Sequence, residues 1–137
     1  MRQSILLDTC AIIFLLSEQL APDALAVLEE ADREGREIYV SPISAWEIGI
    51  LVSRGRLMLR TNPDAWFNTI IESGIRLAAM EPDVLIASSF LPVSTSLRDP
   101  ADRILAATAR AKDYQLMTRD RPLLDYAAEG HLNAVAC

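Results

Sequence analysis

Asp8 is an acidic residue in the middle of an almost wholly apolar stretch, SILLDTCAIIFLL, which covers residues 4–16. An ionised carboxylate in apolar surroundings costs several kcal/mol unless a partner group replaces its lost hydration. Helix capping alone explains Asp8 poorly, because the neighbouring Thr9 could cap a following helix instead. We therefore interpret Asp8 as a functional residue.

Further acids stand at comparable points of the chain. Asp120 comes two residues after the apolar run QLMT, and the stretch DPADRILAATA opens with Asp99 and Asp102. Glu47 lies in ISAWEIGILV, with apolar neighbours on most sides. Each of these acids also has a purely structural explanation. Asp99 is a good N-cap before a proline, Asp120 could cap its own helix, and Glu47 could face solvent.

Several carboxylates in one cleft would define a particular kind of chemistry. They repel one another, so either some of them are protonated or a cation neutralises them. A ligand set made only of oxygen atoms suits a hard ion such as Mg²⁺ or Mn²⁺. Such an ion activates water and holds a phosphoryl oxygen. The residues by themselves therefore predict metal-assisted hydrolysis of a phosphodiester bond.

The other residue types argue against alternative catalytic units and locations. His131 is the one histidine and lies in a predicted turn, which disfavours a Ser-His-Asp or Cys-His unit. Cys10 and Cys137 have neither a disulfide nor a zinc spacing, which indicates a reducing cytosol. The apolar run of residues 5–16 is interrupted by Asp8 and is too short to cross a bilayer. We therefore expect a cytoplasmic protein without a secretory signal or a membrane anchor.

The elements that must position the acids are short apolar strands alternating with helices. This alternation is typical of a parallel sheet covered by helices on both faces, so we predict an α/β fold in one domain of residues 1–137. The expected strands cover residues 5–7, 38–40, 75–80, 115–118 and 133–136. The expected helices cover residues 9–18, 22–35, 41–53, 64–73, 82–90, 99–112 and 122–127, with a loop at 91–97.

This order of elements gathers the acids at one edge of the sheet. Ligands of open α/β sheets bind beyond the carboxyl ends of the strands. Asp8 ends the first strand and Asp120 follows the fourth, so the two share that edge if the strands are parallel. Glu47 lies about two turns into the helix after the second strand, with Ser44 one turn before it. A helix that starts at this edge would point Glu47 back towards the crevice.

The charge of the chain is negative overall but unevenly distributed. A net charge of −6 argues against a nucleic-acid partner. However, residues 98–121 carry six bases and four acids, whereas residues 1–50 carry three bases and nine acids. Guanidinium groups suit phosphates and carboxylates equally well. The arginines of this segment are therefore explained by solvent exposure or ion pairing as well as by phosphate binding. Four of these bases flank the candidate acids in sequence: Arg98, Arg103, Arg119 and Arg121.

Four segments of the chain resemble, in order and spacing, the motifs of PIN-domain ribonucleases. They are LLDT at residues 6–9, SPISAWEI at 41–48, DPADRILAATA at 99–109 and TRDR at 118–121. The Trp-Glu-Ile version of the second motif and the compact length are similar to the VapC-type toxins of bacterial toxin–antitoxin modules. A lone LLDT would be weak support, but four motifs in order over essentially the whole chain are specific.

The resemblance implies a three-layer α/β/α sandwich with a central parallel sheet of about five short strands. It implies that one acidic site binds Mg²⁺ or Mn²⁺ and carries out catalysis, with Asp99 nearby as either a ligand or a helix cap. The residues of this site would be Asp8, Glu47, Asp102 and Asp120. The hydroxyl groups expected to support them are those of Thr9, Ser44 and Thr118.

The resemblance also implies an activity and partners. Members of the family cleave single-stranded or looped RNA by metal-activated water and leave a 5′-phosphate and a 3′-hydroxyl. They commonly form homodimers and are silenced by a cognate antitoxin whose tail occupies the cleft. The four flanking arginines would then contact RNA phosphates or antitoxin carboxylates. The loop before Asp99 lacks the histidine often found there, which bears on substrate choice and leaves the acids untouched.

Other functions fit the sequence less well. A phosphatase of the haloacid-dehalogenase type also begins with an apolar strand ending in Asp, but it needs a second Asp where this chain has Cys10. A non-catalytic protein-binding module of the same fold predicts a broken acid set, whereas all four acids are present here. A nuclease of RNA processing without an antitoxin also remains open.

Overall fold

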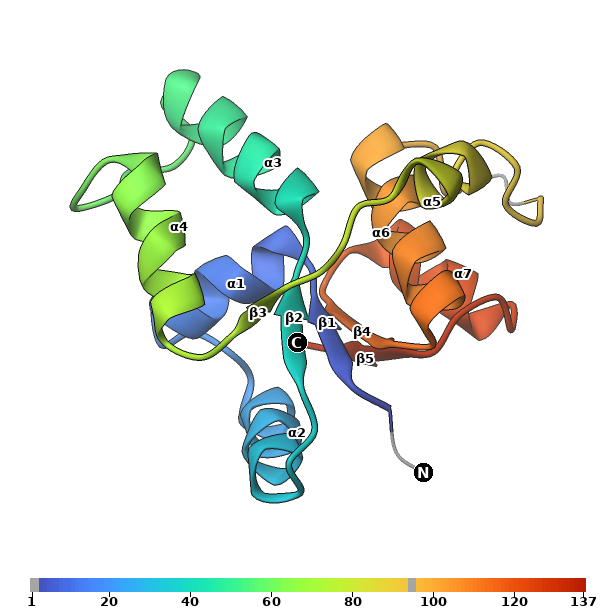
Figure 1. Ribbon diagram of the computed structural model, residues 1–137, viewed down its shortest axis with the longest axis horizontal. Helices are drawn as coiled ribbons and strands as arrows, with labels where there is room; N and C mark the ends of the chain where they lie inside the picture. The colour runs from blue at the N-terminus through green and yellow to red at the C-terminus, as the bar shows by residue number, and fades with distance from the viewer. Residues whose placement is uncertain (1–2, 94–95) are drawn as a thin grey trace.

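The computed structural model describes residues 3–93 and 96–137, and in these ranges helices alternate with short strands (Figure 1). The strands are β1 (Ile5–Leu7), β2 (Ile38–Val40), β3 (Arg76–Leu77), β4 (Gln115–Thr118) and β5 (Ala134–Ala136). The helices are α1 (Thr9–Leu16), α2 (Pro22–Arg33), α3 (Pro42–Ser53), α4 (Pro63–Glu72), α5 (Pro82–Ala87), α6 (Pro100–Lys112) and α7 (Arg121–Ala128).

The five strands form one parallel sheet in the order β3-β2-β1-β4-β5. β1 lies at its centre, where Leu6 faces Tyr39 of β2 on one side and Leu116 of β4 on the other. All three residues of β1 are fully buried, as expected for a strand that pairs on both sides and is covered on both faces. The predicted parallel α/β fold is confirmed.

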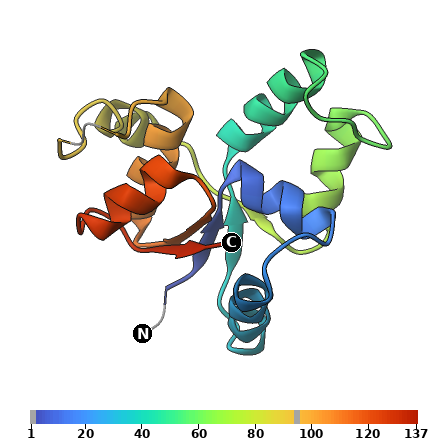
Figure 2. The same cartoon turned by 180° about the vertical axis from the view of Figure 1, so that it is seen from behind.

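Alternate residues of β1 face two separate hydrophobic cores. Ile5 and Leu7 pack with residues of α1, α2 and α4, whereas Leu6 packs with residues of α6 and α7. Figures 1 and 2 show these two groups of helices on opposite sides of the sheet. The molecule is therefore a three-layer α/β/α sandwich, as the family resemblance implied.

Several predicted boundaries are wrong by a few residues. The strand expected at residues 75–80 is only β3, Arg76–Leu77, because it lies at the edge of the sheet and pairs with β2 alone. The first helix ends at Leu16 rather than residue 18, because Glu18 has a left-handed φ of 58°. α5 ends at Ala87, three residues early. The expected loop at 91–97 lies partly outside the described residues.

The parallel sheet places the starts of several helices at one edge. The chain leaves β1 directly into α1, β2 into α3 and β4 into α7 (Figure 1). α6 packs against α3 and β4, so its start lies near the same edge. Within the described residues, no helix is both long and apolar enough to cross a membrane.

Candidate active site

A cavity of about 390 Å³ opens at the carboxyl edge of the sheet. The four acids predicted from the sequence all line it, although they come from the ends of β1 and β4 and from α3 and α6. The cavity also has an apolar wall and one arginine. Its lining residues are Asp8, Thr9, Cys10, Ile13, Phe14, Glu47, Leu51, Asp102, Arg119 and Asp120.

Asp8 is held at the end of β1 by three separate contacts. Its backbone N–H donates to the Met117 carbonyl of the neighbouring strand at 2.9 Å. One carboxylate oxygen, Oδ1, accepts from the Thr9 N–H at 2.7 Å, and the other, Oδ2, accepts from the Thr118 hydroxyl at 2.6 Å. The residue is 4 % exposed. Burial raises the pKa of the Asp8 carboxyl, and these hydrogen bonds work against that rise.

Glu47 and Asp8 are linked through Thr9, the first residue of α1. The Thr9 hydroxyl donates to Glu47 Oε1 at 2.6 Å and lies 2.9 Å from the Ser44 hydroxyl oxygen. Ser44 and Glu47 are three positions apart on α3 and therefore share a face of that helix. Burial is the main reason why the pKa of Glu47 is raised, and the charge of Asp8 adds to it. Of the hydroxyl groups expected from the sequence, that of Thr9 thus contacts Glu47, whereas that of Ser44 contacts Thr9.

Asp102 is affected by burial and by the charges of the surrounding acids. Burial raises its pKa from 3.8 to about 8, and the negative charges around it contribute in the same direction. In order of decreasing effect, these charges belong to Asp120, Asp8, Asp99 and Glu47. A carboxyl group with this pKa is largely protonated at neutral pH unless a cation enters the cavity.

Asp99 and Asp120 both cap helices, but only Asp120 lines the cavity. Asp99 accepts a hydrogen bond from the Asp102 N–H at 3.0 Å and so caps α6. Asp120 accepts from the Leu123 N–H at 3.3 Å and caps α7. The Asp120 N–H donates in turn to the Thr118 hydroxyl at 3.0 Å, so this one hydroxyl joins Asp120 to Asp8.

The four predicted arginines have different surroundings. Arg119 lines the cavity, whereas the Arg103 guanidinium donates to the backbone carbonyls of Ser88 and Leu97 at 2.9 and 2.8 Å. Arg121 is exposed and lies 3.9 Å from Asp125, and Arg98 is also exposed. The structure therefore brings one of the four, Arg119, into the cavity.

The donor set of the cavity fits a hard divalent cation. Its polar lining consists mainly of carboxylate and hydroxyl oxygens, and its mutually repelling carboxylates favour the entry of positive charge. In the part of the chain that the structure describes, no three acidic, histidine or cysteine side chains already converge closely enough to hold an ion.

The sequence analysis did not identify Cys10 or the apolar wall as parts of this cavity. Cys10 Sγ lies 3.3 Å from Asp8 Oδ2, and the wall consists of Ile13 and Phe14 from α1 and Leu51 from α3. The available signal was spacing, since Cys10, Ile13 and Phe14 follow Asp8 within two helical turns. Because α1 is apolar on almost every side, that spacing did not indicate which side was accessible.

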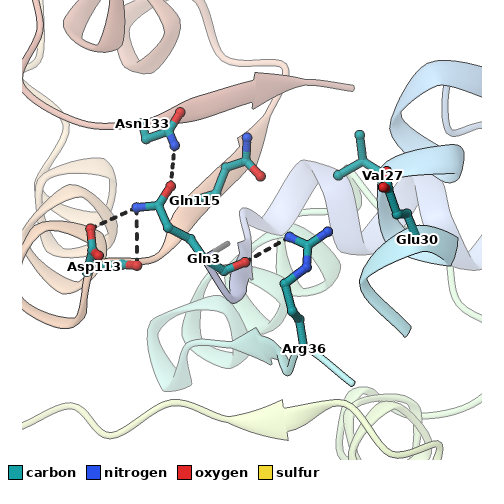
Figure 3. Close-up of a pocket in the computed structure, with 7 residues that line it drawn as sticks. All are labelled: Gln3, Val27, Glu30, Arg36, Asp113, Gln115 and Asn133. Atoms are coloured by element: carbon teal, nitrogen blue, oxygen red, sulfur yellow. Dashed lines mark hydrogen bonds between the residues drawn. The ribbon is translucent and has the colours of Figure 1, made fainter. Parts of the chain in front are cut away.

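A second cavity, of about 530 Å³, lies at the opposite edge of the sheet and is lined mainly by amide and charged side chains (Figure 3). Gln3 Nε2 donates to the Asp113 side chain at 2.8 Å, and Arg36 Nη1 donates to the Gln3 carbonyl at 2.9 Å. These bonds join the start of β1 to the segments that precede β2 and β4. We interpret this network as structural because the chemistry-bearing acids lie at the other edge.

The fold and the site thus define a class of protein. Its members are parallel α/β sandwiches with a carboxylate-lined cavity at the carboxyl edge of the sheet. Residues 5–129 match the family model described as PIN domain. The chain is also 32% identical over 106 residues to "Ribonuclease VapC22" of Mycobacterium tuberculosis. The aligned region covers 77% of each chain. This protein therefore belongs to the PIN-domain family.

Solved structures share the fold at lower sequence identity. One is VapBC2 from Rickettsia felis bound to a DNA fragment from its promoter, with a TM-score of 0.64 and 15% identity over 96% of this chain and 97% of that one. Another is FitAB bound to the IR36 DNA fragment, with a TM-score of 0.62 and 22% identity over 96% of this chain and 94% of that one. Both support the three-layer architecture.

Proposed function

We propose that this protein is an endoribonuclease of the VapC type, which hydrolyses RNA phosphodiester bonds with a divalent cation, Mg²⁺ or Mn²⁺. The observation that carries the proposal is the meeting of four acids from separate parts of the sequence around one cavity. The name of the mycobacterial relative, a ribonuclease, supports the same activity. The proposed ligands are Asp8, Glu47, Asp102 and Asp120.

The chain's own residues have distinct roles in this proposal. Asp8 would be the ligand with a fixed position, because one backbone hydrogen bond to the neighbouring strand and two side-chain hydrogen bonds hold it. Asp102 would lose its proton to hold the cation, since a pKa of about 8 leaves its carboxyl largely protonated at neutral pH. Thr9 and Thr118 orient the carboxylates, as groups around metal ligands generally do. When bound, the cation supplies Lewis acidity and a water molecule with a lowered pKa.

We further propose a cognate antitoxin and a second copy of this chain as partners. The resemblance of the four motifs to VapC-type toxins, which act with a cognate antitoxin, supports the first partner, and the solved structures titled VapBC2 and FitAB share this fold. The antitoxin would silence the enzyme by occupying the acidic cavity, where Arg119 offers a partner for its carboxylates. Induction of the protein in a bacterial host is expected to arrest growth, and the Asp8→Asn variant is expected not to.

The cleavage proposal is tested with purified protein and a pool of tRNA and rRNA. Wild-type protein in Mn²⁺ should cut the RNA, and EDTA should stop the reaction. Asp8→Asn should lower the rate about 100-fold or more, because loss of a ligand removes several kcal/mol of metal-dependent stabilisation. The matched control is Asp23→Asn, which changes an exposed acid in the first turn of α2.

Each result of this experiment bears on the proposal. Cleavage that depends on metal, survives in Asp23→Asn and is lost in Asp8→Asn supports it. Equal cleavage by wild type and Asp8→Asn would mean that the acids do not form the centre. Binding of Mn²⁺ without any cleavage of the pool would contradict a general ribonuclease activity, while an absence of binding would contradict the metal centre itself.

A further inference from the structure

The apolar wall of the acidic cavity has no role in the chemistry proposed above. Ile13 and Phe14 of α1 and Leu51 of α3 face the same space as the four acids. All three side chains are only partly buried, so they present apolar surface to the cavity. A metal ion and a phosphate need oxygen and nitrogen groups rather than hydrocarbon. The wall therefore indicates that another part of the substrate enters this space.

Arg119 gives this wall a charged, planar face. Its guanidinium carbon lies over the Phe14 ring, 3.9 Å from the ring centroid. Its Nε and Nη2 groups donate to the Cys137 carbonyl at 3.0 and 2.7 Å, which fixes the position of the group. The residue remains exposed and lines the cavity. Because these hydrogen bonds fix the guanidinium, its flat face is available for stacking. A guanidinium without such bonds would be mobile.

We propose that this surface, made by Phe14 and Arg119 with Ile13 and Leu51 beside them, binds one unpaired nucleobase of the RNA next to the bond that is cut. The inference rests on the proposed nuclease function and specifies its substrate. Unstacked bases of single-stranded RNA stack on aromatic rings and on guanidinium planes. A cavity of about 390 Å³ is of the size of small-molecule sites, so it suits one nucleotide rather than a helix.

The chemistry of the surface also predicts which features of the RNA matter. Stacking recognises the π-face that every base has, so it selects unpaired RNA while tolerating different sequences. A paired base inside a duplex is stacked between its neighbours and is unavailable to the cavity. Within the unpaired RNA that the family resemblance already implies, the surface is therefore expected to require a base beside the cleaved bond and to accept any of the four bases.

Variants that keep the charge and change the surface separate base stacking from phosphate binding. Arg119→Lys preserves the positive charge but removes the guanidinium plane. Phe14→Leu preserves an apolar side chain but removes the ring, and Phe14→Tyr restores it. The matched control is Arg33→Lys, because Arg33 is exposed in the last turn of α2 and is not one of the residues lining the cavity.

The experiment uses two fluorescently labelled probes, octa-adenylate and an octamer of abasic ribose phosphates. Binding is measured by fluorescence anisotropy in Ca²⁺, an ion that also takes oxygen ligands. Wild-type protein should bind octa-adenylate about 10-fold more tightly than the abasic probe. Arg119→Lys and Phe14→Leu should each weaken binding of octa-adenylate about 5- to 50-fold and change binding of the abasic probe less than about twofold.

Phe14→Tyr and Arg33→Lys should bind both probes as wild type does, and thermal melts of all variants monitor folding. Equal losses for both probes in Arg119→Lys would overturn the proposal in favour of a phosphate contact. Equal wild-type affinity for the two probes, or no binding of either, would also overturn it. The separate cleavage assay distinguishes the two proposals. Base-dependent binding without cleavage supports this site and contradicts the nuclease. Cleavage without base preference supports the nuclease and contradicts this site.

Discussion

Individual acids in this protein serve the fold and the cavity together. Asp8 and Asp120 each cap a helix and line the cavity, so a capping role does not exclude these side chains from the proposed site. Asp99 caps α6 and lies outside the cavity lining. Asp8 and Asp120 combine the two roles because each lies between the carboxyl end of a strand and the start of the next helix.

The raised pKa of Asp102 predicts how stability of the metal-free protein depends on pH. Between the unfolded value of 3.8 and the folded value of about 8, the folded state binds more protons than the unfolded state. The free energy of unfolding therefore falls as pH rises from about 4 to about 8. Asp102→Asn removes this term, so it should raise the melting temperature at pH 8 and have little effect at pH 4.

Thermal melts in EDTA across this pH range provide the measurement. Asp64→Asn is the control, since Asp64 is an exposed acid in the first turn of α4, away from the cavity. A melting temperature of Asp102→Asn that stays below wild type at pH 8 would show that the carboxylate is stabilising in the folded state. That result would contradict the repulsion described here.

At the scale of elements, the N-terminus of α6 permits a test of Asp99. Its side chain accepts the Asp102 N–H, which is the bond of an N-cap. Asp99→Ala should lower the free energy of unfolding by about 1 kcal/mol, measured by urea denaturation, while Asp99→Asn should change it little. Cleavage by Asp99→Asn should stay close to wild type. A large loss of cleavage in this well-capped variant would instead identify Asp99 as a ligand.

The elements themselves were largely predictable, and the surfaces they present were not. Runs such as Ile5–Leu7 and Gln115–Thr118 are short, apolar and followed by capping acids, so both their ends are marked in the sequence. The ends of β3 were not marked in this way. β3 is an edge strand whose residues Arg76 and Leu77 are exposed, so its sequence needs no run of apolar residues. The accessible side of α1 depends on how α3 packs beside it, which is a tertiary contact.

At the scale of the whole molecule, the proposed metal centre would couple cation binding to folding. The acids come from four segments that meet only in the folded chain, so a cation that binds them stabilises the folded state. At a Mg²⁺ concentration of about 100 times Kd, the melting temperature should rise by roughly 5–10 °C. The rise should be larger at pH 8 than at pH 6, because protons compete for Asp102 at the lower pH.

Potassium chloride at matched ionic strength controls for general salt effects in these melts. Asp8→Asn should lose most of the Mg²⁺-dependent rise and keep the small response to potassium. An equal rise in wild type and Asp8→Asn would place the ion elsewhere on the protein.

The edge of the sheet where the helices begin has an electrostatic consequence of its own. α1, α6 and α7 all start beside the cavity, and each helix N-terminus carries the equivalent of about half a positive charge that fades within one turn. These partial charges offset part of the negative charge of the four carboxylates in the cavity, although the protein as a whole has a net charge of −6. An RNA strand would then be held mainly through the proposed cation and repelled elsewhere, so the logarithm of its affinity should fall only shallowly with the logarithm of monovalent salt concentration.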